Sequence, residues 1–535
     1  MPLPEVASKP SGWKPWLSHK GLYWVLRCLL PMALVLVVLA LYGQFVWNPI
    51  VFDDMYLFLA DDRGHMPVMD IQYAPFELRS LPYATLAWTL SYLGNSLIYF
   101  RIGNLVLHAA VVLAVYGCIL GVRPLYASRR RDGTDHSVAA ALALLFAVHP
   151  VAVFAAGYLV QRTLLFATLF SVLAIWAYAH GSARQRPRAC WFALGLYYLA
   201  VFSKEHAVML VAIFPLITVS LHTDWRQTLR KEWPPLLLGL ALAVVVFLMR
   251  RYVVAQVYEP DAAALVTQSA IAHPYFSSVL TQAAAFFHYI ALWLLPNVAW
   301  MSIDMRVPIA QSLFSLQGGL FLVYLAWGAL ASTWVLRHGR WARLGLVMLF
   351  PWLMGLTELV TVRVQEPFVL YRSYLWAAGA LCFVAVCPLP RLGRRGWAGV
   401  AVLALVLFGL SMERLQTFSH PYLVWDDAER LLAGNTGLPG ASRIYYNRGT
   451  QLLQLQKWPE AEKDLQTAIR LQPDFAPAYG NLGVALLRQS AWAASAEAFG
   501  HAADLDRAAG RPPQERYYRG RAEALEQMPK AAPAR

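Results

Sequence analysis

Residues 21–42, GLYWVLRCLLPMALVLVVLALY, form an apolar run long enough to cross a bilayer. The run follows a basic N-terminal stretch (Lys9, Lys14, Lys20 and Arg27). It is too long for the apolar part of a signal peptide and lacks a clear small-residue cleavage site. We therefore expect an uncleaved first span, with residues 1–20 in the cytoplasm.

The composition indicates that most of the chain is as apolar as a membrane protein. Of the 535 residues, 58% are apolar and 14% are charged, and the mean hydropathy is +0.45. A soluble domain carries about 25% charged residues, so the composition predicts a polytopic membrane protein and excludes a disordered or collagen-like chain.

The net charge of +14 lies mostly in the apolar part: residues before Arg414 have an excess of 12 basic side chains, and the residues from Arg414 onward an excess of 2. Most basic residues cluster in short loops, which is typical of cytoplasmic loops rather than of a nucleic-acid-binding face. These loops are Arg123–Arg131, Arg184–Arg188, Arg226–Lys231, Arg337–Arg343 and Arg391–Arg395.

Between the basic loops we expect apolar helices at about 99–121, 138–156, 161–180, 190–203, 207–222, 234–257, 313–336, 343–361, 374–390 and 397–413. With the first span this gives about 11 crossings in an all-α membrane domain, residues 21–413, with an outer loop at 44–98. The odd number puts the C-terminal tail outside, provided that Ser277–Leu295 is re-entrant or interfacial. Arg250 and Arg251 near an outer helix end strain this topology, and the path of 258–312 stays open. A bacterial inner membrane with a periplasmic tail is the expected location.

The tail contains a repeat of 34 residues. Its positions are Tyr445, Gly449, Leu452, Ala461, Leu465, Ala468 and Pro473, and then Tyr479, Gly483, Leu486, Ser495, Phe499, Ala502 and Arg507. This pattern predicts two tetratricopeptide repeats at 442–509, a short α-solenoid. We expect a linker and capping helix at 414–441 and a capping helix with a flexible tail at 510–535. The repeats are either a peptide-docking surface or a stabilising cap on the membrane domain.

Ionisable residues inside apolar segments are costly, and in the expected topology they fall on the outer side: Asp53, Asp54, Arg79, His149, Arg162, Lys204, Glu205, Glu366 and Arg372. They predict an outward-facing polar cavity. The alternative for each residue taken alone is a snorkelling or loop position.

An ordered series of motifs carries a family resemblance. It consists of Phe52-Asp53-Asp54, Arg79-Ser80-Leu81-Pro82, Asn104-Leu105-Val106-Leu107-His108, Phe146-Ala147-Val148-His149-Pro150-Val151 followed by Arg162, Ser203-Lys204-Glu205, Asp304, Glu366 with Tyr371-Arg372-Ser373-Tyr374, and the repeats. From about residue 45 to 508 the chain resembles the GT-C membrane glycosyltransferases, specifically the protein O-mannosyltransferase-like proteins with tetratricopeptide repeats. It departs from the family at Glu366-Pro367, where Glu-Arg is common, and after Arg79, where Pro-Leu is common. These departures leave the roles of Glu366 and Arg79 open.

The resemblance implies a polyprenyl-phosphate-linked sugar as the donor and Ser or Thr hydroxyls of exported proteins as the acceptor, with the acceptor held by the repeats. In this reading Asp53 is the base, and Asp54 is its positioning partner or a metal ligand. Arg162, Lys204 and Arg372 neutralise the lipid phosphate. The remaining residues, which orient these groups or line the site, are Arg79, His108, His149, Glu205 and Glu366. No cofactor is implied, and a divalent metal at Asp53 and Asp54 stays open.

Each assignment has a structural alternative. His149-Pro150 is also suited to capping a helix, Lys204-Glu205 to a local ion pair, and Arg372 to a snorkelling anchor. Two other functions also stay open: transfer to a lipid or surface glycan, and a non-enzymatic membrane scaffold or transporter.

Overall fold

The computed structural model describes residues 19–528, apart from residue 62 and residues 128–132, 251–265, 267–270, 390 and 391. Throughout this described part the regular structure is helical and no extended strand is present; an isolated antiparallel bridge joins Met305 and Phe368. The all-α fold class is therefore confirmed.

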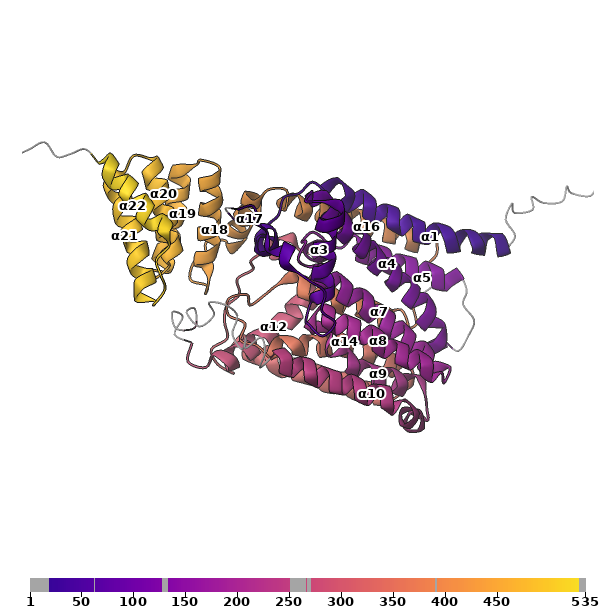
Figure 1. The fold of residues 1–535 in the computed structure, drawn as a ribbon. Helices are drawn as coiled ribbons and strands as arrows, with labels where there is room; N and C mark the ends of the chain where they lie inside the picture. The colour runs from indigo at the N-terminus through magenta and orange to yellow at the C-terminus, as the bar shows by residue number, and fades with distance from the viewer. Residues whose placement is uncertain are drawn as a thin grey trace, which may run out of the picture.

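The apolar part of the chain is a bundle (Figure 1). Its helices are α1 (His19–Tyr42), α4 (Leu97–Ala127), α5 (Gly133–Ala147), α6 (Pro150–Ala156), α7 (Arg162–Ala183), α8 (Pro187–Ser203), α9 (Leu210–Leu221), α10 (Trp225–Leu248), α12 (Pro274–Leu294), α13 (Leu316–Leu336), α14 (Gly339–Gly355), α15 (Ser373–Val384) and α16 (Arg394–Thr417). Between α1 and α4 the chain forms a short 3-10 helix (Phe52–Asp54), α2 (Met55–Phe58), a second 3-10 helix (Pro67–Asp70) and α3 (Ser80–Leu93).

Among the described residues, eight helices are long and apolar enough to cross a membrane, or nine if the bent pair α5 and α6 is one span. This is compatible with a polytopic membrane protein, whereas the expected number of about 11 is not confirmed. The shortfall has a physical reason. The helices α8, α9 and α15 have 17, 12 and 12 residues, and a bilayer crossing takes about 20.

Helix α12 covers the expected re-entrant or interfacial stretch. Near its start, Ser278 donates a hydrogen bond to the carbonyl of Thr361 (3.2 Å). Near its end, the Trp293 indole donates to the hydroxyl of Ser373 (2.9 Å). Thr361 follows α14 and Ser373 begins α15, so both contacts lie at the same end of the bundle. Because α12 also has the length of a span, its re-entrant or interfacial placement stays a prediction.

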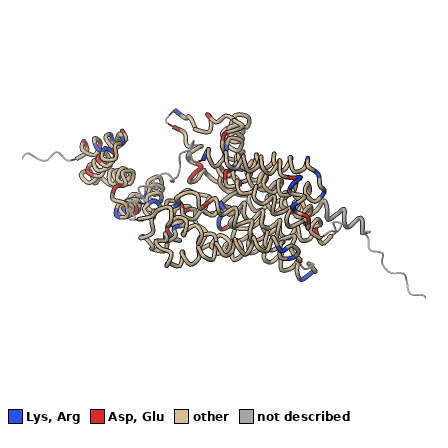
Figure 2. Tube along the Cα trace, turned by 90° about the horizontal axis from the view of Figure 1, so that it is seen from below, with Lys and Arg blue, Asp and Glu red and all other residues tan. Residues whose placement is uncertain are grey.

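Charged residues gather toward the two ends of the bundle, and its middle is almost free of them (Figure 2). One end, where α7 turns into α8 and where α10 begins, carries Arg184, Arg186, Arg188, Arg226 and Arg230. The start of α1 lies on this side, and the C-terminal helices lie beyond the opposite end (Figure 1).

The C-terminal part is a row of antiparallel helices: α17 (Pro421–Leu432), α18 (Ala441–Gln454), α19 (Trp458–Leu471), α20 (Ala476–Arg488), α21 (Trp492–Ala508) and α22 (Glu515–Gln527). The repeat glycines lie where paired helices touch. A Cβ atom on Gly449 would lie 3.0 Å from Leu465, and one on Gly483 would lie 2.9 Å from the Phe499 ring. These close approaches explain why each repeat requires a small residue at this position.

Candidate active site

A cavity of about 1000 Å³ opens at the end of the bundle that faces the repeats. The segments 51–59, 160–163, 204–206 and 361–372 line it on the bundle side, and α17 and α18 line it on the other. Because Gln161 precedes α7 and Lys204 follows α8, this helical hairpin leads away from the cavity and returns to it. Its basic turn therefore lies about 25–33 Å below the cavity at 1.5 Å per residue.

Asp53 lies on the cavity wall in the 3-10 helix Phe52–Asp54 and is half-buried. No group in the described part of the chain donates a hydrogen bond to its carboxylate. Burial, together with the negative charge of Glu366, raises the pKa of Asp53 to about 7, against the opposing effect of Arg443. A carboxylate of this kind takes up and releases a proton near neutral pH.

Asp54 is fully buried and does not line the cavity. Its carboxylate accepts a hydrogen bond from the backbone N–H of Val160 (3.0 Å). Burial raises the pKa of Asp54 to about 6, although Arg101 and backbone N–H groups lower it. Asp54 thus fastens the loop that carries Asp53 to the segment before α7. In the described part of the chain, no group of three or more His, Cys, Asp or Glu side chains is arranged to hold a metal ion.

Two predicted phosphate-binding residues also line the cavity. The Lys204 ammonium donates to the side-chain oxygen of Gln161 (2.7 Å) and lies 4.9 Å from the centre of the Tyr371 ring. The Arg372 guanidinium is nearly fully buried, 3.1 Å from Glu358. It is therefore part of an internal ion pair, which differs from the snorkelling alternative.

Arg79 and Glu205 are predicted site-lining residues that form a two-pronged ion pair on the cavity wall, with 3.0 Å between the Arg79 Nε and the Glu205 Oε2. Glu205 therefore pairs with Arg79, whereas the sequence alternative was a local pair with Lys204. Glu366 also lines the cavity, and Arg443 donates to it from α18 (3.1 Å).

Cations outnumber carboxylates among the described residues of the wall. The cationic side chains are Arg79, Lys204, Arg250, Arg363, Arg372 and Arg443, and the carboxylates are Asp53, Glu205 and Glu366. Such a balance favours an anionic ligand, and guanidinium groups suit the oxygen atoms of a phosphate.

Three predicted site residues besides Asp54 lie outside the cavity lining. Arg162 donates to the side chain of Asn104 (2.8 Å) and to the carbonyl of Phe100 (2.7 Å), so it fastens α7 to α4. His108 is buried, and its Nδ1 lies 2.7 Å from the Tyr374 hydroxyl. His149 accepts a hydrogen bond from the Val151 N–H at the start of α6, which is the helix-capping alternative.

Sequence reasoning missed four charged residues of the site: Arg250, Arg363 and Arg443 on the cavity wall, and Glu358, which pairs with Arg372. Glu358 is buried between His206, Arg363 and Arg372. A single acid near the end of an apolar run was its only signal. Arg443 lies among residues that read as ordinary repeat positions, and nothing in the pattern indicated that it reaches the membrane domain.

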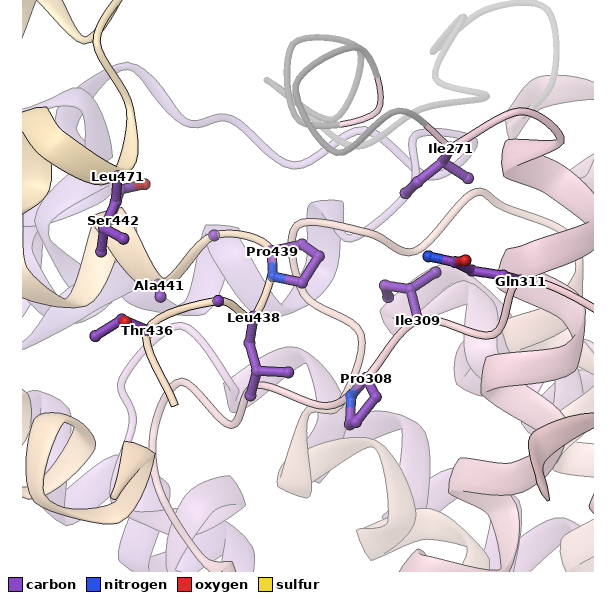
Figure 3. A pocket seen from close by; sticks show the side chains of 12 residues that line it. Ile271, Pro308, Ile309, Gln311, Thr436, Leu438, Pro439, Ala441, Ser442 and Leu471 are labelled. Atoms are coloured by element: carbon purple, nitrogen blue, oxygen red, sulfur yellow. The ribbon is translucent and has the colours of Figure 1, made fainter. Parts of the chain in front are cut away.

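A second cavity, of about 440 Å³, lies between the loop Pro308–Gln311 and the segment Thr436–Ser442. Figure 3 shows Pro308 and Ile309 on one side and Leu438 and Pro439 on the other. None of its described lining residues is ionisable, so it offers no acid–base chemistry.

Comparison with known proteins identifies one feature of the chain. The TPR repeat family matches residues 449–490, from within α18 to the end of α20. The predicted tetratricopeptide repeat is therefore confirmed there. No GT-C or mannosyltransferase family matches the chain. No curated protein and no solved structure matches the chain.

Proposed function

We propose that the protein is a membrane glycosyltransferase of the GT-C type, which transfers a sugar from a polyprenyl-phosphate donor to Ser or Thr hydroxyls of exported proteins. The observation that carries the proposal is the pairing, in one cavity, of a proton-accepting carboxylate with a wall of cations. An anionic leaving group and a hydroxyl nucleophile need these two elements together.

Asp53 is the base in this mechanism. As the acceptor hydroxyl attacks the anomeric carbon of the sugar, its proton passes to the Asp53 carboxylate. A pKa near 7 keeps a large fraction of Asp53 deprotonated at neutral pH and still makes it a competent proton acceptor. Asp54 acts through the loop and holds Asp53 in place.

Lys204 and Arg372 stabilise the departing lipid phosphate. Because the phosphate is a good leaving group, no general acid is required. Both cations are buried, so their interaction with a phosphate is screened less than it would be in water. Glu358 holds Arg372, and Glu205 holds Arg79, so the cations are preorganised before the donor arrives.

The arrangement of the molecule suits a lipid-linked donor. The cavity lies at one end of an apolar bundle, where the head group of a lipid is found and where a polypeptide reaches it from the water. Following the positive-inside rule, we propose that the end with the basic turns is cytoplasmic and that the cavity and the repeats face the bacterial periplasm. The repeats then hold the acceptor.

The test compares proteins exported by cells that carry the wild type, Asp53→Asn, Asp70→Asn or no copy of the protein, by glycopeptide mass spectrometry. Asp70 is an acid of the same outer loop whose side chain is 72% exposed, so it serves as the matched control. We expect Ser- or Thr-linked sugar with the wild type and Asp70→Asn only. Identical profiles in all four strains, with the proteins well expressed, contradict transfer to protein; a modified lipid or glycan then identifies the alternative acceptor.

A further inference from the structure

One side chain of the first repeat helix, α18, contacts the residues of the site. Arg443 of α18 donates from Nε to Asp304 (2.8 Å) and from Nη2 to Glu366 (3.1 Å). Asp304 also pairs with Arg306, which in turn donates to the carbonyls of Gln365 (2.7 Å) and Pro439 (3.2 Å). Two arginines and one buried aspartate thus join the bundle loops to the start of the repeats.

The same guanidinium supports the backbone of the catalytic loop. Its carbon lies 5.1 Å from the centre of the Phe52 ring, which also contacts Trp425 and Tyr158 edge to face at 5.4 and 6.4 Å. Phe52 has a φ of +49°, in the left-handed region that a bulky residue rarely adopts. Such a conformation persists only where its surroundings hold it. Asp53 is the next residue, so the contacts of Phe52 set the direction of its carboxylate.

The charges around Asp53 also link it to Arg443. Glu366 raises the pKa of Asp53 and Arg443 lowers it, and Arg443 also neutralises Glu366 by direct contact. Asp54 also raises the pKa of Asp53 and Lys204 lowers it, and Arg372 lies 4.0 Å from Glu366. Loss of the Arg443 guanidinium therefore removes one of the cations that offset the negative charge beside Asp53.

We infer that Arg443 is a positioning residue for Asp53 and Glu366, so that the first repeat helix is an integral part of the site and not only a docking surface. The role rests on the proposed function, but its geometric and electrostatic effects on Asp53 do not. Loss of Arg443 leaves Asp53 protonated to a higher pH and lets the Phe52 backbone relax.

A purely structural role for Arg443, in fastening the repeats, makes a different prediction. Arg448 lies on the same helix and forms ion pairs with Asp464 (2.7 Å) and Glu429 within the C-terminal helices. It is the matched control: if loosened repeats alone disturb the site, Arg448→Gln will have the same effect as Arg443→Gln.

The experiment measures the pH dependence of carbodiimide coupling to Asp53 in the full-length protein in membranes, by peptide mass spectrometry, because carbodiimides react with protonated carboxyl groups. Exposed Asp70 is the internal reference. The wild-type midpoint is expected near the Asp53 pKa of about 7. In Arg443→Gln it should rise by about half a pH unit or more, whereas Arg443→Lys and Arg448→Gln should stay near the wild type.

An unchanged midpoint in Arg443→Gln, or an equal rise in Arg448→Gln, overturns the inference. Arg443→Met keeps the stem over Phe52 and serves if the glutamine variant does not accumulate. If neither Arg443→Gln nor Arg443→Met accumulates while Arg448→Gln does, Arg443 is required for folding and the inference is also overturned. Glycopeptide yields from the same variants report on the proposed function separately: a midpoint shift without any glycosylated product supports the role of Arg443 and contradicts the glycosyltransferase.

Discussion

Asp53 and Asp54 are neighbours in the chain but have opposite surroundings. Asp53 faces the cavity without a hydrogen-bond donor from the described part of the chain, and Asp54 is sealed against the backbone of Val160. In a short 3-10 helix, adjacent side chains point in different directions, so one acid faces the cavity and the other binds the loop. The first is the base in the proposed mechanism. Exchange of the two roles would require the loop to rebuild.

The Asp53 pKa predicts a pH dependence. The base must be deprotonated, and burial with Glu366 raises its pKa to about 7. Activity is therefore expected to be present above pH 7 and to fall about tenfold per unit as the pH drops below it. The pH profile of kcat/KM with a lipid donor checks this; a profile that stays flat down to pH 5 contradicts it.

Substitution of Arg162 is expected to lower stability, whereas substitution of Lys204 is expected to weaken donor binding. Arg162→Gln removes buried hydrogen bonds to Asn104 and Phe100 and should cost on the order of 3 kcal/mol of stability. Lys204→Gln should raise the donor KM about tenfold or more with a smaller loss of stability, because its charge faces the cavity. Thermal unfolding in detergent and donor titration separate the two effects. The reverse pattern would place Arg162 in the site.

At the scale of elements, the 3-10 helix Leu356–Leu359, which follows α14 and contains Glu358, organises the cations. Glu358 contacts His206, from the segment 204–206, and Arg363 and Arg372, both from the segment 361–372. A buried acid among several cations is tolerated because the partners compensate one another, and removing one partner leaves a charge without compensation.

Glu358→Gln is therefore expected to destabilise the protein by about 3–5 kcal/mol. Glu497→Gln, on an exposed face of the repeats, should change stability by less than about 0.5 kcal/mol. Both are measured as thermal unfolding of the purified protein. A small effect at Glu358 would mean that the cations around it are not held by its charge.

At the scale of the whole molecule, the sequence predicts the class and the two-part organisation well. Apolar runs and basic loops predict an all-helical membrane bundle, and the 34-residue period predicts the repeats. Nine ionisable residues are expected on one face, and six of them line the cavity: Asp53, Arg79, Lys204, Glu205, Glu366 and Arg372.

The remaining features depend on packing between distant segments, which spacing does not encode. Arg162, His108 and His149 belong to the same series of motifs as the cavity residues, but their side chains form hydrogen bonds within the helical bundle. Arg443 belongs to the first repeat helix, α18, but its side chain contacts Glu366 of the bundle. No repeat position predicts that contact. The number of spans also depends on packing, because the helices α8, α9 and α15 are apolar but shorter than a bilayer crossing.

Orientation is a property of the whole molecule as well. The proposed topology predicts that a cysteine at Gln456, in the repeats, is labelled by a membrane-impermeant maleimide in spheroplasts, whereas one at Arg186, in a basic turn, is labelled only after permeabilisation. The native cysteines give the background. If Arg186→Cys is labelled as strongly before permeabilisation as after it, the orientation is the reverse of the one proposed and the cavity faces the cytoplasm.

The most direct test of the central claim is transfer by the purified protein. Wild type, Asp53→Asn and Asp70→Asn, reconstituted in lipid discs, are supplied with lipid-linked sugars extracted from the native membrane and with a pool of Ser- and Thr-containing peptides, and the intact peptide masses are measured. The account predicts a sugar mass on Ser or Thr with the wild type and Asp70→Asn, and a loss of about a hundredfold or more with Asp53→Asn. Equal product from Asp53→Asn, or no product from a well-folded wild type, would contradict it.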